Sequence, residues 1–183
     1  MRHNGHPLTT PQLTSSLTLS RQDGTTLTLE LQPLPLGFYR RLRERGVIPP
    51  TPPSKPARDS NGRLIRDAQG HAVTINSPHD PQYLADLERY HQRVAVLSLA
   101  EALTADPHTQ FESQPPTEAA GNADISRWLT YADQLADELE SAGFRAGDLI
   151  IICQEICRLS NLLGDQLNGA TANFSSGSQT DST

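Results

Sequence analysis

The apolar segment that follows Gly147 constrains the fold of this 183-residue chain more than any other feature. Apolar residues recur at helical spacing between residues 149 and 163, and Ile150, Ile151 and Cys157 extend the apolar character around much of the helix. A helix that is apolar on nearly every side must be buried on most of them. The sequence therefore predicts a helix over 149–163 that needs neighbours on several faces.

Two further helices are predicted in the same part of the chain. Residues 125–141 place apolar side chains at i, i+3 and i+4, with Asp124 in the capping position and Gly143 as the stop. A short helix is expected over 165–174, and the polar tail 175–183 is expected to be disordered. Together these segments predict a small helical bundle over 124–174.

Three short helices cannot cover so apolar a segment completely, which predicts surface left over for a partner protein or a second copy. The candidate partner-binding residues are the apolar side chains along the two longer helices and their connection: Trp128, Leu135, Leu139, Phe144, Leu149, Ile152, Ile156 and Leu159.

The first half of the chain predicts hairpins followed by a long helix. Leucines alternate with Thr and Ser on both sides of a Gly24 turn, which predicts a β-hairpin over 13–31 with one apolar face. A second small hairpin is expected over 61–75, around a turn at 67–70. Asp80 and Pro81 are a capping residue and a first helical residue, so a long helix is expected over about 82–103.

These elements predict an α+β fold that is mainly α. Residues 1–11 are expected to be a flexible terminus, and 12–104 to hold the hairpins, a proline-rich strap at 48–60 and the long helix. Residues 105–123 are polar and contain three prolines, so we expect a linker there and place a domain boundary in it. The helical subdomain 124–174 and the tail 175–183 follow.

The composition argues against several classes of function. The net charge of −6 does not favour a broad nucleic-acid surface, and the four arginines of 40–45 are interpreted as a solvated helix face. No apolar run approaches the roughly 20 residues of a membrane span, and the start of the chain lacks the apolar stretch of a secretory signal. We therefore expect a cytosolic protein with no membrane or nucleic-acid partner.

No catalytic pattern is recognisable in the sequence. It has no glycine-rich phosphate loop, no CxxC pair, no HExxH and no GxSxG. Cys153 and Cys157 share a helix face and are interpreted as small buried apolar residues, because a zinc site needs further ligands and the nearest histidine is His108. We expect no enzyme activity, cofactor or metal, and a small enzyme or metal protein is the weakest hypothesis.

The order of short motifs along the chain resembles one protein family. Asp80-Pro81-Gln82-Tyr83 opens the long helix and Ala100-Glu101-Ala102-Leu103 closes it. After the variable linker come the remaining motifs: Trp128, Tyr131, Leu135, Ala142-Gly143-Phe144, Asp148-Leu149, Ile156-Cys157-Arg158-Leu159-Ser160, Leu167, Ala170 and Asn173-Phe174. Over roughly residues 33–174 this pattern resembles the tail assembly chaperones of long-tailed bacteriophages.

The resemblance implies a function without catalytic residues. Proteins of this family bind the aggregation-prone tape measure protein, keep it soluble in the cytoplasm of the bacterial host, and help to recruit tail tube subunits. They are absent from the mature virion, and the family often has a longer product made by a translational frameshift. The alternative hypothesis is a structural virion protein, such as a minor tail or adaptor component.

Overall fold

The computed structural model describes residues 2–3, 6–7, 14–21, 23–117 and 125–162. Its helices are α1 (Phe38–Glu44), α2 (Pro81–Ala102), α3 (Ile125–Ser141) and α4 (Ala146–Leu159). Its strands form antiparallel pairs, namely β1 (Arg2–His3) with β2 (His6–Pro7), β3 (Ser15–Ser20) with β4 (Thr26–Leu31), and β5 (Ser54–Pro56) with β6 (Thr74–Asn76). The predicted α+β fold, mainly helical with a hairpin before a long helix, is confirmed.

The first predicted hairpin is the β3–β4 pair. Its register places Leu17 opposite Leu29 and Leu19 opposite Leu27, so the leucines share one face. Leu19, Leu29 and Leu31 are buried, whereas the alternating Ser and Thr side chains face solvent. The hairpin thus contributes a leucine-rich face, with Ser15 at its end, to the rest of the molecule. Position 13, where the prediction began, lies outside the described residues.

The helix boundaries follow local capping chemistry. The Asp80 carboxylate accepts hydrogen bonds from the backbone N–H groups of Gln82 and Tyr83, so α2 begins where the capping signal predicted. Helix α4 was predicted over 149–163, but it begins at Ala146 and ends at Leu159. It stops early because Asn161 takes a left-handed conformation with φ 52°. The helix expected over 165–174 lies outside the described residues.

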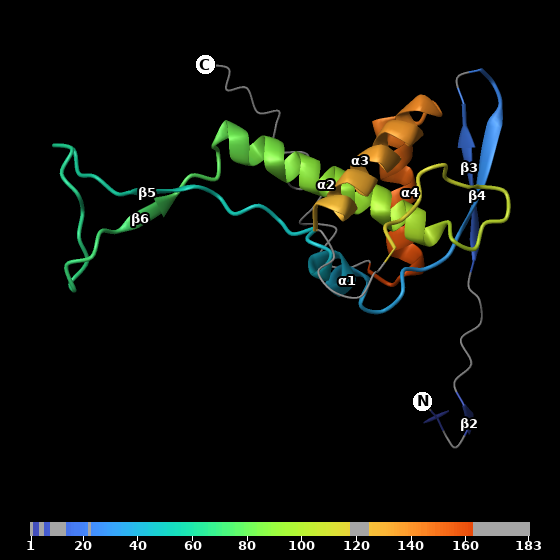
Figure 1. The fold of residues 1–183 in the computed structure, drawn as a ribbon, viewed down its shortest axis with the longest axis horizontal. Helices are drawn as coiled ribbons and strands as arrows, with labels where there is room; N and C mark the ends of the chain where they lie inside the picture. The colour runs from blue at the N-terminus through green and yellow to red at the C-terminus, as the bar shows by residue number, and fades with distance from the viewer. Residues whose placement is uncertain (1, 4–5, 8–13, 22, 118–124, 163–183) are drawn as a thin grey trace, which may run out of the picture.

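A single core joins the two halves of the chain. Helix α2 packs against both α3 and α4, and β3 packs against α4; Figure 1 shows α2 running across the α3–α4 pair with the β3–β4 hairpin at its far end. One cluster of buried side chains draws on the hairpin and all four helices, with Leu29, Leu31, Leu99, Ala132, Leu135 and Ile152 wholly enclosed. The helices after residue 124 therefore do not pack as a separate subdomain.

The first part of the predicted linker is attached to the body. Asp106 is buried, and its carboxylate accepts a hydrogen bond of 3.1 Å from the backbone N–H of Glu30 in β4. Glu138 of α3 accepts bonds of 2.7 and 3.0 Å from the backbone N–H groups of Glu112 and Ser113. These carboxylates hold the segment against β4 at one end and α3 at the other, and positions 118–123 lie outside the described residues.

A core substitution in the hairpin should lower the stability measured at the distant helix α3. Leu29→Ala should lower the free energy of unfolding by about 2–5 kcal/mol, because the wholly buried leucine leaves a cavity. Urea denaturation followed by the fluorescence of Trp128, the only tryptophan, measures this effect from α3. Leu36→Ala is the control, since Leu36 is fully exposed. An unchanged Trp128 transition in Leu29→Ala would show that the hairpin and α3 unfold independently.

Candidate binding surfaces and the projecting arm

The structure places most of the predicted partner-binding residues inside the core. Six of the eight are buried, and Phe144 and Leu149 are partly buried against the same cluster. The buried six are Trp128, Leu135, Leu139, Ile152, Ile156 and Leu159. The expectation that these side chains form exposed binding surface needs correction, because it overlooked the β3–β4 hairpin and α2, which cover the apolar faces of α3 and α4.

Polar contacts fix the hairpin over α4. The Ser15 hydroxyl donates to the Glu155 carboxylate at 2.7 Å, and the same carboxylate accepts two bonds from the Arg158 guanidinium. At the other end of β3, Arg21 donates to the carbonyl oxygen of Gly143 at 2.8 Å, and its guanidinium lies 4.3 Å from the centre of the Phe144 ring. Phe144 is therefore covered by an arginine from the hairpin rather than left open for a partner.

Glu155 is the most strongly perturbed carboxylate of this contact. The Arg158 guanidinium first, and the Ser15 hydroxyl second, lower the pKa of Glu155 from an ordinary 4.5 to about 2. Both donors favour the charged form, so the carboxylate stays ionised well into the acid range. The hairpin is thus attached to α4 by a charged group as well as by apolar packing.

A small apolar remainder of α4 does reach solvent. Ile150 is 52% exposed and Ile151 48% exposed, on the side of the helix away from the core. The two free cysteines lie half-buried on the same helix, and burial, with the neighbouring Cys157, raises the pKa of the Cys153 thiol to about 11. A thiol with so high a pKa is a poor nucleophile at neutral pH, which agrees with the interpretation of these cysteines as apolar packing residues.

The pocket between α2 and the segment after α1 is shallow, with a volume of about 190 Å³. Arg93 in its wall donates two bonds, of 2.7 and 2.6 Å, to the carboxylate of Asp133 in α3. That fork ties α2 to α3 and is already neutralised. Among the described residues no group of three or more His, Cys, Asp or Glu side chains could hold a metal ion.

The arginines of α1, and Arg45 at its C-cap, make contacts within the body or along the helix. Arg41 pairs with Glu101 of α2 at 3.0 Å, and the Arg45 guanidinium lies 3.8 Å from the centre of the Trp128 ring. Arg40 lies near Glu44, with 3.7 Å between nitrogen and oxygen, and both side chains are largely exposed. These contacts stabilise the docking of α1. The predicted solvated face is present at Arg40 and Arg43, which are exposed, whereas Arg41 and Arg45 are partly buried against the body.

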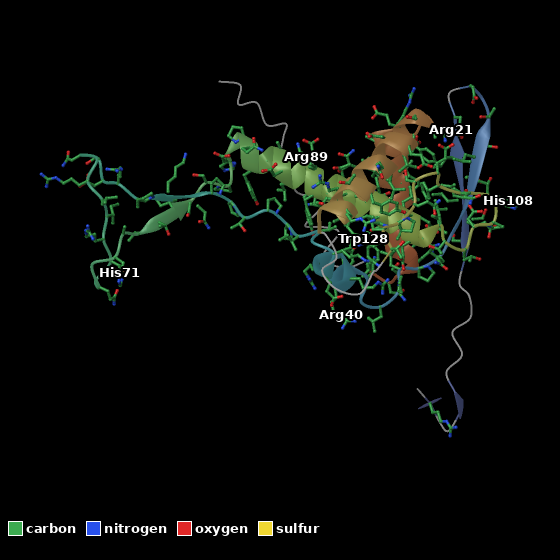
Figure 2. The ribbon with its side chains drawn as sticks, in the orientation of Figure 1. Arg21, Arg40, His71, Arg89, His108 and Trp128 are labelled. Atoms are coloured by element: carbon green, nitrogen blue, oxygen red, sulfur yellow. The ribbon has the colours of Figure 1, made fainter. Side chains whose placement is uncertain are left out.

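Among the described residues, 54–76 form an exposed arm between α1 and α2. It begins with β5 and ends with β6, and Figure 1 shows it projecting away from the helices beyond the first turn of α2. Every residue of the arm is exposed except Ala57, and none belongs to the core cluster. Figure 2 shows His71 at the far end of the arm, well away from Trp128 in the body. The arm therefore contributes no burial to the core.

Two copies of one eight-residue unit build the arm. Residues 58–65 read Arg-Asp-Ser-Asn-Gly-Arg-Leu-Ile, and residues 66–73 read Arg-Asp-Ala-Gln-Gly-His-Ala-Val. In each unit the aspartate carboxylate accepts two backbone N–H bonds and the arginine donates to the glycine carbonyl. Gly62 and Gly70 have φ values of 77° and 85°, a left-handed conformation that favours glycine. The two turns are thus the same structure made twice.

A closed ring of backbone hydrogen bonds joins the units at their base. Ala57 N–H donates to the Val73 carbonyl at 2.7 Å, Ile65 N–H to the Ala57 carbonyl at 2.9 Å, and Val73 N–H to the Ile65 carbonyl at 2.9 Å. These three residues are spaced by eight, the length of the unit. The ring brings three extended segments together and orders the arm without a hydrophobic core.

The sequence prediction of this region was partly wrong. A turn at 67–70 was predicted and is present, with Arg66 bridged to Ala72. A proline-rich strap was predicted over 48–60, whereas residues 54–56 form β5, which pairs with β6. The signal that could have found this was the repeat itself, Arg-Asp-x-x-Gly at positions 58 and 66.

Comparison with protein-family models, with curated proteins and with solved structures finds no match for this chain. Within the described residues, no helix is both long enough and apolar enough to cross a membrane.

Acid should weaken the contacts of Glu155, which are mainly with Arg158 in α4 and secondly with Ser15 in the hairpin. The folded-state pKa of Glu155 is about 2 and the ordinary value is 4.5, so its stabilising contribution is present above about pH 4.5 and is lost as the pH falls towards 2. Glu155→Gln should therefore cost about 1–2 kcal/mol at pH 7 and progressively less below pH 4.5. Urea denaturation across pH 3–7 measures the difference. Glu88→Gln is the control, because Glu88 lies on the exposed side of α2 and its replacement should change the stability little at pH 7. A penalty for Glu155→Gln that does not change with pH would contradict the assignment.

Loss of an aspartate should loosen its turn in the arm without changing the thermal stability of the body. Asp67→Ala removes the acceptor for the backbone N–H groups of Gln69 and His71, so their amide exchange should become faster. The melting temperature followed by Trp128 fluorescence should stay the same, because no arm residue packs in the core. NMR amide exchange and a thermal melt test the two halves of this prediction. A melting temperature lowered by several degrees would mean that the arm supports the body.

Proposed function

We propose that this chain is a non-catalytic phage tail assembly chaperone, which binds the tape measure protein in the cytoplasm of the bacterial host and keeps it soluble. It would also help to recruit tail tube subunits. The order of motifs from Asp80 to Phe174 supports the proposal through its resemblance to that family. A chaperone of this kind needs reversible burial of exposed surface and no chemical step.

The projecting arm is the observation that carries the proposal. It is an ordered element of 23 residues that contributes nothing to the core of its own chain, which is the property expected of a surface kept for another molecule. Ile150 and Ile151 on α4 add a second, smaller exposed apolar surface. The features that would favour catalysis are weak in the described part of the chain, where the shallow pocket beside α2 is lined by arginines paired to carboxylates.

The same arm also favours the alternative of a structural virion protein, because a rigid projection is suited to lasting contacts between subunits. The two functions differ in where the protein ends up. A chaperone leaves before the particle is complete, whereas a minor tail or adaptor component stays. Mass spectrometry of purified particles separates them, and stoichiometric recovery of this chain from mature virions would replace the chaperone proposal with the structural one.

Co-expression tests the chaperone function directly. The tape measure protein encoded in the same genome should be mostly insoluble when it is expressed alone, and this chain should raise its soluble fraction about tenfold or more if the complex is of micromolar affinity or tighter. The complex should be recovered by affinity purification through either partner. An equal soluble fraction with and without this chain would overturn the proposal.

A further inference from the structure

We propose that the arm, residues 54–76, is a docking element for an acidic, partly apolar segment of a partner protein, with Arg58 and Arg66 as its two anchors. This inference deepens the proposed chaperone function, since it names the element that contacts the client. It rests on four features of the arm, which are its charge, the fixed position of the two arginines, its exposed apolar side chains and the absence of aromatic residues.

The arm is basic in a chain that is acidic. It carries four of the chain's 15 basic residues but only two of its 21 acidic ones. Both of those carboxylates are used inside the arm, since Asp59 and Asp67 each accept two backbone N–H bonds of their own turns. These bonds fix the two carboxylates within the turns but leave them charged, and the four basic residues still outnumber them. The positive excess favours a partner surface that carries carboxylates.

The turns hold the two anchor arginines in place. Arg58 donates from one terminal nitrogen to the Gly62 carbonyl at 2.7 Å, and Arg66 donates in the same way to the Gly70 carbonyl at 2.6 Å. Both residues are exposed, so the rest of each guanidinium fork is accessible. A guanidinium that is already positioned loses less side-chain entropy when it binds a carboxylate with two parallel hydrogen bonds.

Apolar side chains lie exposed beside these charges. Leu64, Ile65, Val73 and Ile75 are between 37% and 58% exposed, although aliphatic side chains of this size are usually buried. Ile65 and Val73 hold equivalent positions in the two units. A binding surface with an apolar centre and a charged rim is typical of protein–protein contacts.

The same composition argues against a nucleic acid as the occupant. Residues 54–76 contain no Phe, Tyr or Trp on which a base could stack. The basic residues of the arm would attract any polyanion, but exposed aliphatic side chains gain nothing from a phosphate backbone. A protein segment with carboxylates and apolar side chains satisfies both features of the arm.

The arm can be deleted without removing any residue of the core cluster, so its contribution to binding can be tested directly. Ser77 N–H donates to the Pro53 carbonyl at 2.8 Å, so the two ends of the arm lie side by side. Residues 54–76 can therefore be replaced by two glycines that join Pro53 to Ser77. Because no arm residue belongs to the core, the excised protein should keep the melting temperature of the full chain.

The probe is a fluorescently labelled 20-residue peptide in which pairs of Glu alternate with pairs of Leu. A peptide with Lys in place of every Glu is the control. Fluorescence anisotropy should show that the full chain binds the acidic peptide and not the basic one. Excision of the arm should abolish binding, and Arg58→Gln with Arg66→Gln should weaken it about tenfold or more. Arg40→Gln with Arg43→Gln removes the same charge from the exposed face of α1 and should change the affinity less than twofold.

The outcomes separate this inference from the proposed function. Equal binding by the excised protein, loss of binding in the α1 control, or no binding of the acidic peptide by the full chain would each overturn the docking role of the arm. Tighter binding of a single-stranded 20-nucleotide DNA than of the acidic peptide would overturn the protein partner. Co-expression with the tape measure protein tests the chaperone function alone, so a chain that solubilises its client equally well without the arm would retain the function and lose the inference.

Discussion

The burial of α4 is the constraint on which the rest of the structure depends. Its apolar face is wider than any one neighbour can cover, and it is enclosed only because α2 lies along it and the β3–β4 hairpin, more than a hundred residues away in sequence, closes over it. The attachment of Glu155 to Ser15 fixes the hairpin at that position. Because α4 follows the 105–117 segment and both elements that cover it precede that segment, the body folds around one core and cannot be divided there.

Carboxylates that accept hydrogen bonds from backbone N–H groups attach the irregular segment after α2 to the body. Burial alone would raise the pKa of Asp106, but bonds from the N–H groups of His108 and Glu30 and from the Thr109 hydroxyl outweigh burial and hold that pKa below its ordinary value. The same balance lowers the pKa of Glu138, which binds the segment at 112–113. A charged oxygen can satisfy several N–H groups of an irregular segment at once. This is why a stretch without helix or strand can follow the surface of the body closely.

Local signals in the sequence predicted the start of α2 and the end of α3, and they were insufficient to predict the bounds of α4 or which helix faces meet. Asp80 and Pro81 set the start of α2, because helix capping acts within a few residues. Which element covers Ile152 or Trp128 depends on contacts between distant segments, and no periodicity encodes it. The candidate binding residues were therefore predicted to be excess apolar surface, whereas α2 and the β3–β4 hairpin of the same chain cover them. In the arm, the pairing of β5 with β6 escaped prediction because prolines in an extended run usually indicate an unpaired strap.

The arm poses the opposite problem to the body, since it is ordered without burial. Each of its turns is held by an aspartate, a left-handed glycine and an arginine, and the ring through Ala57, Ile65 and Val73 joins them. Hydrogen bonds exposed to water contribute little net stability, so they offset only part of the conformational entropy that the ordered arm has lost. A fixed projection has already lost the conformational entropy that a flexible loop would lose on binding. The regularity of two identical turns, in a segment on which the core does not depend, is therefore better explained by what the arm contacts than by what it stabilises.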